Sequence, residues 1–188
     1  MTSQTLLDTS RAVEQLRTGH IIAYPTEAVF GLGCDPRNES AIRKLLAIKN
    51  RSVAAGFVLI ASNFEQLQPW VAETEPRLLD KAMQTWPGPV TWLFPRAADV
   101  PDLVAGKHAT IAVRITAHEP SRALCAAFGS ALISSSANTR SAKPALSVAE
   151  VEDYFANQLG GILAGPLGSA QQPSEIRDLV SGNIIRQG

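Results

Sequence analysis

The chain has 188 residues, of which 45% are hydrophobic and 18% are charged, proportions typical of a folded domain rather than a disordered chain. Lys+Arg and Asp+Glu number 17 each, so the formal net charge is +0. Proteins that bind a long stretch of nucleic acid usually carry a basic surplus, because neutralising phosphates supplies most of the affinity. The composition therefore disfavours an extended nucleic-acid interface and leaves room for a local cationic pocket.

Cysteine content and apolar runs indicate the compartment. Cys34 and Cys125 are too few for a disulfide framework and too far apart for a paired-ligand motif. Both are predicted to be small buried residues in a reducing compartment. Residues 1–8 lack the basic flank and apolar core of a signal peptide, and no apolar run is long enough to cross a membrane. We expect a cytoplasmic protein that does not bind membranes.

Helix-like and strand-like segments alternate along the chain. In chain order, the sequence predicts a helix over 8–18, a strand over 21–24, a helix over 40–49, a strand over 57–61, a helix opening at 62, a helix over 75–86, strands over 90–94 and 110–115, a helix over 120–128, a strand over 131–135, a helix over 147–158, a strand over 162–164 and a hairpin of 176–180 with 184–186. The helices at Ser62 and Ser147 are predicted from capping boxes, and Pro76 suits a first helical turn.

The alternation of helices and strands predicts one α/β domain over residues 1–188, with much parallel pairing and an antiparallel hairpin at the end. The loops over 99–107 and 165–172 are polar and are expected to be mobile. They are too short to separate domains.

Two cations stand close together at the end of the second predicted helix. Lys49 continues the apolar stripe formed by Ile42, Leu45 and Leu46, which would carry its ammonium inward. The same spacing fits a lysine that snorkels to solvent and complements the helix C-terminus. Arg51 follows just beyond the helix. If both point inward, they suit a polyphosphate or a carboxylate, for which arginine offers a planar fork and lysine a movable point charge.

A third cation lies within a predicted strand. Apolar residues alternate over 110–115, so Arg114 shares the other face with Thr110 and Ala112, whose small side chains leave room for a ligand. A solvent-exposed face has the same pattern, so both interpretations stay open.

Small polar residues follow the strand over 131–135. The run Ser134-Ser135-Ser136-Ala137-Asn138 offers hydroxyl and amide groups and lets the backbone approach a ligand closely. Ligands in open α/β sheets gather outside the carboxyl ends of strands. A plain polar turn has the same composition.

Other kinds of site have less support. Gly31-Leu32-Gly33 lacks the third glycine of a dinucleotide fingerprint, and no Walker-type lysine loop occurs. The histidines lack paired zinc-ligand spacing, and no serine lies in a Gly-x-Ser-x-Gly elbow. A nucleophilic Cys34 is an alternative to the buried-thiol interpretation.

A series of short motifs follows in a characteristic order: Tyr24-Pro25-Thr26-Glu27, Phe30-Gly31-Leu32-Gly33, Lys49-x-Arg51, Trp86-Pro87-Gly88-Pro89, Ala112-Val113-Arg114-Ile115, Ser136-x-Asn138, Pro173-Ser174-Glu175-Ile176-Arg177-Asp178 and Arg186-Gln187-Gly188. No single motif is specific. In this order and spacing, from about Gly19 to the C-terminus, the set resembles the YrdC/TsaC family of threonylcarbamoyl-AMP synthases.

The resemblance implies a twisted, open sheet of mixed parallel and antiparallel strands flanked by helices, with a concave cationic cavity. It implies the short form of the family, without the extra C-terminal domain of longer relatives. The implied activity is that of a nucleotidyltransferase, which condenses L-threonine, bicarbonate or CO2, and ATP with Mg²⁺ into L-threonylcarbamoyladenylate and pyrophosphate. The product serves tRNA processing. A separate threonylcarbamoyl transferase complex, met transiently, modifies the adenosine next to the anticodon, so tRNA is expected to bind this chain at most weakly.

The resemblance also implies roles for individual residues. The expected catalytic and ATP-binding residues are Lys49, Arg51, Ser136 and Asn138, with Arg186 as a further ATP contact. The expected threonine-binding residues are Thr26, Arg114, Ser134 and Ser174. Arg114 is the natural partner of the threonine carboxylate. Fixed cations and the Mg²⁺ carried by ATP would stabilise the charge that develops on the phosphoryl oxygens, so no dedicated protein ligands for a metal are expected.

Two loops depart from the family pattern. Ser52 stands where the family usually has proline, which is expected to loosen the loop beside the phosphates. Thr139-Arg140-Ser141 stands where the family usually has Leu-Ser-Gly, which adds a cation.

A non-catalytic RNA-binding module, acting on tRNA or in ribosome assembly, is the main alternative. The balanced charge and the few aromatic residues disfavour it. A different ATP-using ligase or carbamoyl transferase on the same fold is a second alternative, which substrate dependence would separate.

Overall fold

The computed structural model describes residues 5–139 and 142–188, so Arg140 and Ser141 of the second divergent loop lie outside the described residues. The helices are α1 (Thr9–Arg17), α2 (Glu39–Ile48), α3 (Pro76–Met83), α4 (Asp102–Ala105), α5 (Glu119–Phe128) and α6 (Val148–Phe155). The strands are β1 (Leu6–Leu7), β2 (Ile22–Pro25), β3 (Phe30–Gly33), β4 (Val58–Ala61), β5 (Val90–Pro95), β6 (Thr110–Ile115), β7 (Leu132–Ser136), β8 (Gly161–Leu163), β9 (Glu175–Asp178) and β10 (Ile184–Arg186).

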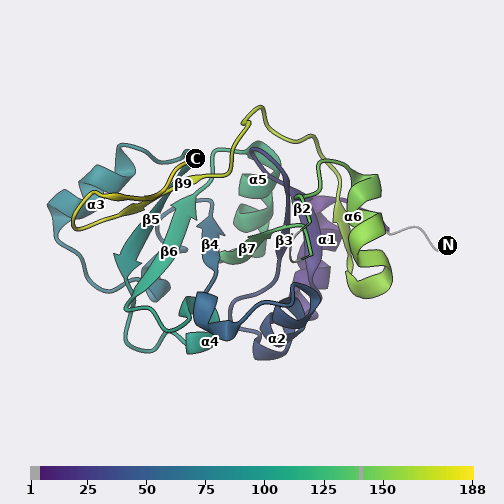
Figure 1. The fold of residues 1–188 in the computed structure, drawn as a ribbon, viewed down its shortest axis with the longest axis horizontal. Helices are drawn as coiled ribbons and strands as arrows, with labels where there is room; N and C mark the ends of the chain where they lie inside the picture. Colours follow the sequence, from purple (N-terminus) through teal and green to yellow (C-terminus); the bar gives the residue numbers. More distant parts are fainter. Residues whose placement is uncertain (1–4, 140–141) are drawn as a thin grey trace.

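One sheet runs along the long axis of the molecule, with its strands in the order β1-β8-β2-β3-β7-β4-β6-β5-β9-β10 (Figure 1). Strand β4 pairs parallel with β6, and β5 pairs parallel with β9. The pairs β2–β3, β4–β7 and β5–β6 are antiparallel. The predicted mixed sheet is therefore confirmed.

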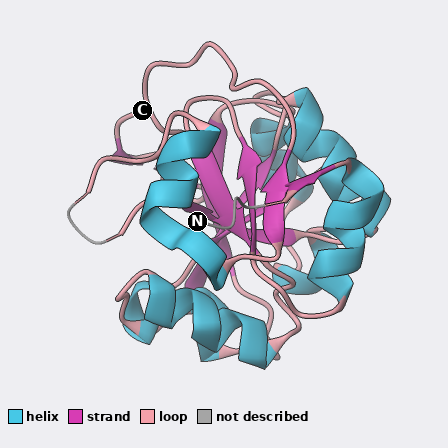
Figure 2. Ribbon diagram, turned by 90° about the vertical axis from the view of Figure 1, so that its right-hand side faces the viewer, coloured by secondary structure: helices cyan, strands magenta, loops and turns pink. Residues whose placement is uncertain are grey.

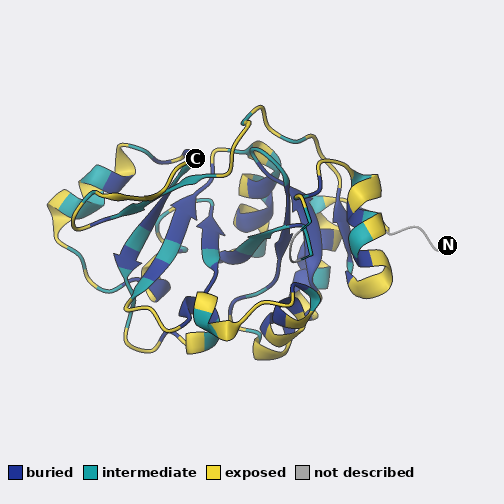
Figure 3. Ribbon diagram, in the orientation of Figure 1, coloured by how far each residue is buried: buried dark blue, intermediate teal, exposed yellow. Residues whose placement is uncertain are grey.

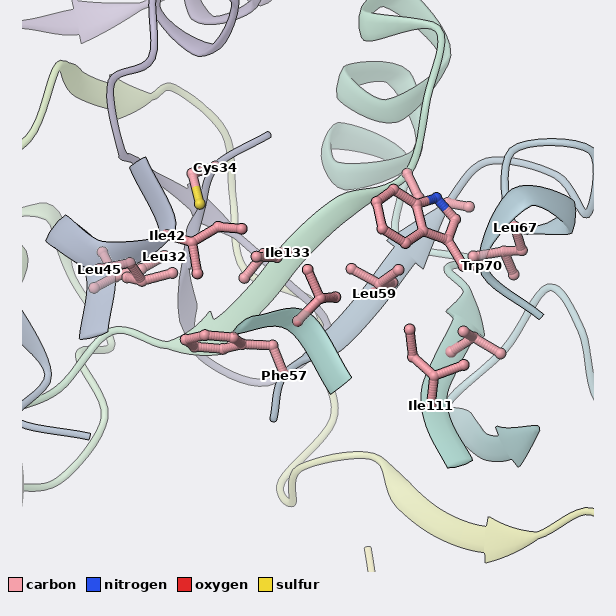
Figure 4. Close-up of a cluster of buried hydrophobic side chains, with 14 of the residues drawn as sticks. Leu32, Cys34, Ile42, Leu45, Phe57, Leu59, Leu67, Trp70, Ile111 and Ile133 are labelled. Carbon is pink, nitrogen blue, oxygen red and sulfur yellow. The ribbon is translucent and has the colours of Figure 1, made fainter. Parts of the chain in front are cut away.

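Helices pack on both faces of this sheet (Figure 2). Adjacent strand residues point to opposite faces, and β4 shows the division. Ile60 belongs to a cluster that contains Leu16 of α1 and Leu124 of α5. Leu59 belongs to the larger cluster, which contains Ile42 and other residues of α2 (Figure 4). The strands carry most of the buried surface, and the helices expose their outer sides (Figure 3).

Local capping explains where several helices begin and end. The side chain of Asp8 accepts a hydrogen bond from the Arg11 N–H at 2.8 Å, and that of Asn38 accepts one from the Ala41 N–H at 3.0 Å. Ser147 accepts from the Glu150 N–H at 3.2 Å, so the helix start predicted at Ser147 is confirmed, although the Glu150 carboxylate accepts from the Leu146 N–H and not from the Ser147 N–H of a full capping box. Helix α5 ends at Gly129, which has a φ of 82°.

The helix predicted to open at Ser62 is wrong. The Ser62 N–H donates to Gln66 Oε1 at 2.9 Å, and the Gln66 N–H donates to Asn63 Oδ1 at 3.1 Å. These bonds close a turn in place of a helical cap. The short 3₁₀ helix Gln68–Trp70 follows, and Pro69 within it lacks the N–H that a longer helix would need.

Strands β1 and β3 and helix α4 lie where no helix or strand is predicted, and β1 has only two residues, which pair with β8. Strand β3 (Phe30–Gly33) alternates with glycine, which weakens a strand pattern, yet it pairs with both β2 and β7. Helix α4 (Asp102–Ala105) occupies the loop over 99–107, and Val104 and Ala105 are buried. Its four residues are too few to produce a helical period.

The two cysteines are buried and free, as predicted. Burial raises the pKa of each thiol to about 12, so neither is a ready nucleophile. Among residues 5–139 and 142–188, no helix is long and apolar enough to span a membrane.

Candidate functional site

A cavity of about 440 Å³, called here the main cavity, lies over the middle of the sheet. Five neighbouring strands contribute residues to the lining, which include Gly31 of β3, Ser134 of β7, Val58 of β4, Ala112 of β6 and Leu93 of β5. Gly31, Ser134 and Ala112 have small side chains or none, so these strands leave open space above the sheet for the cavity.

Incomplete helix cover explains why the cavity is open. Ile60 is fully buried in the cluster formed with α1 and α5, whereas Val58, two residues earlier on the same face of β4, packs against that cluster only partly buried and also lines the cavity. The cover by these helices thus ends within β4. Beyond that point, β6 and β5 present Thr110, Ala112 and Leu93 to the cavity. The site lies across a sheet face, not outside the strand ends.

Arg114 lies on the cavity side of β6 and is only 6% exposed, so the interpretation as a solvent-facing arginine is wrong. Its Nη1 donates to Glu27 Oε1, and Thr116 Oγ1 donates to the same oxygen at 2.7 Å. Burial alone would raise the pKa of Glu27, but Arg114 and Thr116 lower it below its usual value, so the carboxylate is ionised. Within the described part of the chain, buried Arg114 Nε has no hydrogen-bond partner.

Lys49 also points inward and is 7% exposed. Its ammonium donates to the backbone oxygen of Ser136, to the backbone oxygen of Asn138 at 2.8 Å and to Asn138 Oδ1 at 3.0 Å. Ser136 Oγ donates to the same Oδ1 at 2.6 Å. Lys49 therefore joins the end of α2 to the turn after β7. Burial, and then the neighbouring charge of Arg51, lowers the pKa of Lys49 to about 8.

Arg51 and its loop are held by local contacts. Arg51 Nη2 donates to the Gly56 oxygen at 2.7 Å, and the guanidinium carbon lies 5.1 Å from the centre of the Phe57 ring. Ser52 Oγ accepts from the Ala54 N–H at 3.2 Å and caps the short 3₁₀ helix Val53–Ala55. A proline cannot supply this side-chain acceptor, so the divergent Ser52 provides a cap where a looser loop is predicted.

Thr26 lies in the turn after β2, and its hydroxyl donates to the Val29 oxygen at 2.6 Å. The segment over 165–172 crosses this turn. The Gly168 N–H donates to the Thr26 oxygen at 2.9 Å, and the Ala170 N–H donates to the Glu27 oxygen at 3.0 Å. Ala170 lines the main cavity, so these bonds make part of its wall.

The C-terminal hairpin forms another wall. Ser174 Oγ lies 2.9 Å from Thr91 Oγ1, and Arg186 Nη2 donates to the Ser174 oxygen at 2.6 Å. Ser174 and Arg186 both line the main cavity. Burial, and then the charge of Arg114, lowers the pKa of Arg186.

The structure brings the predicted site residues together in two adjoining cavities. The main cavity is lined by Thr26, Arg51, Arg114, Ser134, Ser136, Ser174 and Arg186. A second cavity of about 500 Å³, called here the side cavity, is lined by Lys49 and Asn138 and shares Arg51 and Ser136 with the main one. Because Glu27 offsets Arg114, a cationic character of the whole site stays a prediction.

Sequence analysis does not single out Glu27 or Thr116. Glu27 stands inside the motif Tyr24-Pro25-Thr26-Glu27 but has no expected role. Thr116 follows Arg114 by two residues, so strand alternation places both on one face and could have indicated it. Among residues 5–139 and 142–188, no group of three or more His, Cys, Asp or Glu side chains is arranged to hold a metal ion.

Comparison with known proteins finds close similarity along nearly the whole chain. Residues 14–188 match the family Sua5/YciO/YrdC, described as telomere recombination. A threonylcarbamoyl-AMP synthase of Coxiella burnetii is 47% identical over 175 residues, 93% of this chain and 94% of that protein. A threonylcarbamoyl-AMP synthase of Pseudomonas savastanoi is 48% identical over 179 residues, 95% of this chain and 96% of that protein.

A solved structure gives the same result for the fold. The crystal structure of P. abyssi Sua5 complexed with L-threonine matches with a TM-score of 0.84 and 27% identity, over 94% of this chain and 53% of that one. The chain thus spans about half the length of that protein. The resemblance noted from the motifs is confirmed, and the chain belongs to the Sua5/YciO/YrdC family.

Proposed function

We propose that this chain is a threonylcarbamoyl-AMP synthase, which makes L-threonylcarbamoyladenylate and pyrophosphate from L-threonine, bicarbonate or CO2, and ATP. The observation that carries the proposal is the junction of two cavities at Arg51 and Ser136, with Arg114 in one and Lys49 in the other. A carboxylate site and a phosphate site then lie side by side. The names of the relatives and the threonine complex of P. abyssi Sua5 support this choice of substrates.

Threonine is assigned to the main cavity. Arg114 takes its carboxylate, and Thr26, Ser134 and Ser174 provide the polar lining around it. A volume of about 440 Å³ lies within the range of small-molecule sites.

ATP is assigned to the junction and the side cavity. Arg51, with its fork of donors, faces the triphosphate, and Lys49, whose N–H groups bind the turn after β7, adds its positive charge beside it. Ser136, Asn138 and Arg186 complete the nucleotide site. Lys49 also braces the turn that carries Ser136. Mg²⁺ arrives on ATP, because phosphate oxygens are the ligands it prefers.

The reaction then needs positioning and charge stabilisation rather than a protein nucleophile. The carbamate oxygen of N-carboxythreonine attacks the α-phosphorus of ATP, and pyrophosphate leaves. The cations stabilise charge on the phosphoryl oxygens. Holding the reactants together can lower the barrier by about 7–11 kcal/mol.

The same proposal covers the cellular setting. The enzyme is a nucleotidyltransferase of tRNA processing that works in the cytoplasm and passes its adenylate to a threonylcarbamoyl transferase complex. On this view tRNA binds weakly at most.

Pyrophosphate release tests the proposal. The purified chain is incubated with ATP and Mg²⁺, and threonine and bicarbonate are added separately and together. We expect release only when both are present. Release that ignores either substrate would refute the proposal, and RNA binding with a steep salt dependence and no turnover would favour the RNA-binding module instead.

A further inference from the structure

Among the described residues that line the main cavity, Glu27 is the only carboxylate. It lies directly against Arg114, and its side chain is 19% exposed while that of Arg114 is 8% exposed. An arginine placed to bind carboxylic acids in general gains nothing from a neighbouring carboxylate, since the acid of the protein competes with the acid of the ligand. Glu27 therefore needs an explanation.

Three contacts keep Glu27 in place. Its Oε1 accepts from Arg114 and from Thr116 Oγ1, and Thr116 is fully buried. Its backbone oxygen accepts from the Ala170 N–H at 3.0 Å. The backbone of Gly168 lies so close that an added Cβ would stand 2.6 Å from the Glu27 oxygen. Glu27 is thus fixed in the cavity lining with its charge beside that of Arg114.

The Nε of Arg114, which is unpaired among the described residues, indicates which ligand charges the Arg114–Glu27 pair can bind. Arg114 uses Nη1 for Glu27, and its Nε is buried without a partner in the described chain. The guanidinium still has donors for a ligand carboxylate. A ligand that carries only a negative charge, however, is repelled by the neighbouring carboxylate of Glu27. A ligand with a cation beside its carboxylate meets an opposite charge at both positions.

We propose that Glu27 accepts a hydrogen bond from the amino group of the incoming amino acid, so that the Arg114–Glu27 pair selects an α-amino acid over an acid without the amino group. The ammonium and carboxylate of an α-amino acid sit on one carbon, which matches two adjacent opposite charges. After carboxylation the nitrogen keeps one N–H, which Glu27 continues to accept. The inference rests on the proposed function, which makes threonine the substrate.

The test compares two ligands in wild type and Glu27→Gln. One is threonine, measured by its KM in pyrophosphate release, and the other is (R)-3-hydroxybutyrate, which is threonine without its amino group, measured as an inhibitor. Glu27→Gln should raise the threonine KM by roughly tenfold or more and lower the inhibition constant of 3-hydroxybutyrate by a similar factor. Opposite signs are the signature of ammonium recognition. Weakening of both ligands alike, or no change in either, would overturn it.

Two further variants separate the effect of the Glu27 charge from that of the hydrogen bond that holds its side chain. Thr116→Val removes one hydrogen bond to Glu27 and keeps every charge, so the threonine KM should rise slightly and 3-hydroxybutyrate should not bind better. Glu39→Gln removes a carboxylate that pairs with Arg43 on α2 and does not line the main cavity, so neither constant should change. Thermal unfolding of each variant shows whether it is folded.

If Glu27→Gln does not fold, Glu27→Asp carries the test. The shorter carboxylate withdraws from the amino group and keeps its charge, so the threonine KM should rise while inhibition by 3-hydroxybutyrate stays weak. An unchanged threonine KM would overturn the assignment. A wild-type enzyme that does not require threonine would refute the proposed function itself, whereas a threonine-dependent wild type with no opposite shift refutes only the role of Glu27.

Discussion

The ammonium of Lys49 donates to three oxygens of the turn after β7. An ammonium has three N–H donors, so this turn can use all of them. The helical spacing leaves open whether Lys49 points inward or snorkels outward. The oxygens of Ser136 and Asn138 that accept from the ammonium fix the inward direction. These residues are far from α2 in the sequence, so a local pattern could not have predicted the contact.

The pKa of Lys49, lowered to about 8 by burial and by Arg51, predicts a pH dependence. Above about pH 8 the ammonium of the ligand-free enzyme loses its charge, so kcat/KM for ATP should fall as pH rises through that value. Stability should change in the opposite direction. The unfolded chain binds more protons between the folded pKa and the usual lysine value, so this residue's contribution to stability rises with pH in that window.

Profiles of kcat/KM for ATP, from about pH 7 to about pH 10, check this prediction, because kcat/KM reports the ionisation of the free enzyme. Lys49→Arg is the matched control, because arginine stays charged over the whole range. It should retain some activity and lack the fall near pH 8. An identical fall in Lys49→Arg would assign the titration to another group.

Arg114→Ala should mainly raise the threonine KM, whereas Lys49→Ala should mainly lower kcat. Removing Arg114 takes away the fork that binds the carboxylate, while Lys49 acts on the charge that develops during the reaction. Steady-state kinetics with threonine and ATP varied separately measure both effects. An equal loss of ATP and threonine affinity in Arg114→Ala would contradict this division of roles.

Arg114→Ala should also lower the free energy of unfolding, because it leaves the carboxylate of Glu27 in a largely buried site without its cation. Breaking a buried ion pair in this way costs about 3 kcal/mol. The double variant Glu27→Gln with Arg114→Ala should recover part of this loss in a denaturant titration. Purely additive losses would mean that the two side chains are not coupled.

At the scale of single elements, the loop around Arg51 packs against the end of α4 through two glycines. Gly56 has a φ of 58° and Gly106 a φ of 69°. A Cβ at Gly106 would stand 2.5 Å from the Ala54 oxygen, and one at Gly56 would stand 2.6 Å from the Ala105 oxygen. This close approach sets the position of the loop that carries Arg51.

Gly106→Ala should therefore lower both stability and activity, and Gly129→Ala is its matched control. Gly129 also has a positive φ, 82°, but a Cβ there would meet nothing within 4 Å. Gly129→Ala should cost about 1 kcal/mol from backbone strain and leave activity unchanged. Gly106→Ala adds a steric collision, so its unfolding midpoint should drop further. Equal midpoints for the two variants would contradict the packing argument.

The elements themselves could largely be predicted from local patterns. Capping and apolar periodicity place α1, α2 and α6, and alternation places β6. Helix α4 is too short to show a period, and β3 is half glycine. The capping box at Ser62 fails because Gln66 Oε1 accepts from the Ser62 N–H, which the Glu65 carboxylate would accept from in the box. The predictions thus fail where the local sequence pattern is weak, as in α4 and β3, or where other side chains form a competing turn, as at Ser62.

At the scale of the whole molecule, the site depends on pairings between distant segments. Sequence reasoning identifies Arg114 and Ser134 as candidates but not the strand order, with β4 between β6 and β7, that brings both into one cavity. The parallel pairing of β9 with β5 also lies beyond local patterns. In Figure 1 the yellow hairpin of β9 and β10 runs along β5 towards α3, where Lys81 Nζ donates to the Leu179 oxygen at 3.1 Å.

The last prediction concerns β10, the outer strand of this hairpin. Leu179, before the turn, is buried in the core, but the three residues of β10 are not. Ile184, Ile185 and Arg186 of β10 are exposed, yet Ile185 and Arg186 line the main cavity. Arg186→Ala should thus reduce activity severalfold with an almost unchanged melting temperature. Ile184→Ala is the control on the same strand, because Ile184 does not line the cavity, and it should change neither. If Arg186 serves only the cavity, its removal leaves the rest of the sheet intact and the melting temperature nearly unchanged. A large drop in the melting temperature of Arg186→Ala would contradict this and would mean that β10 supports the fold.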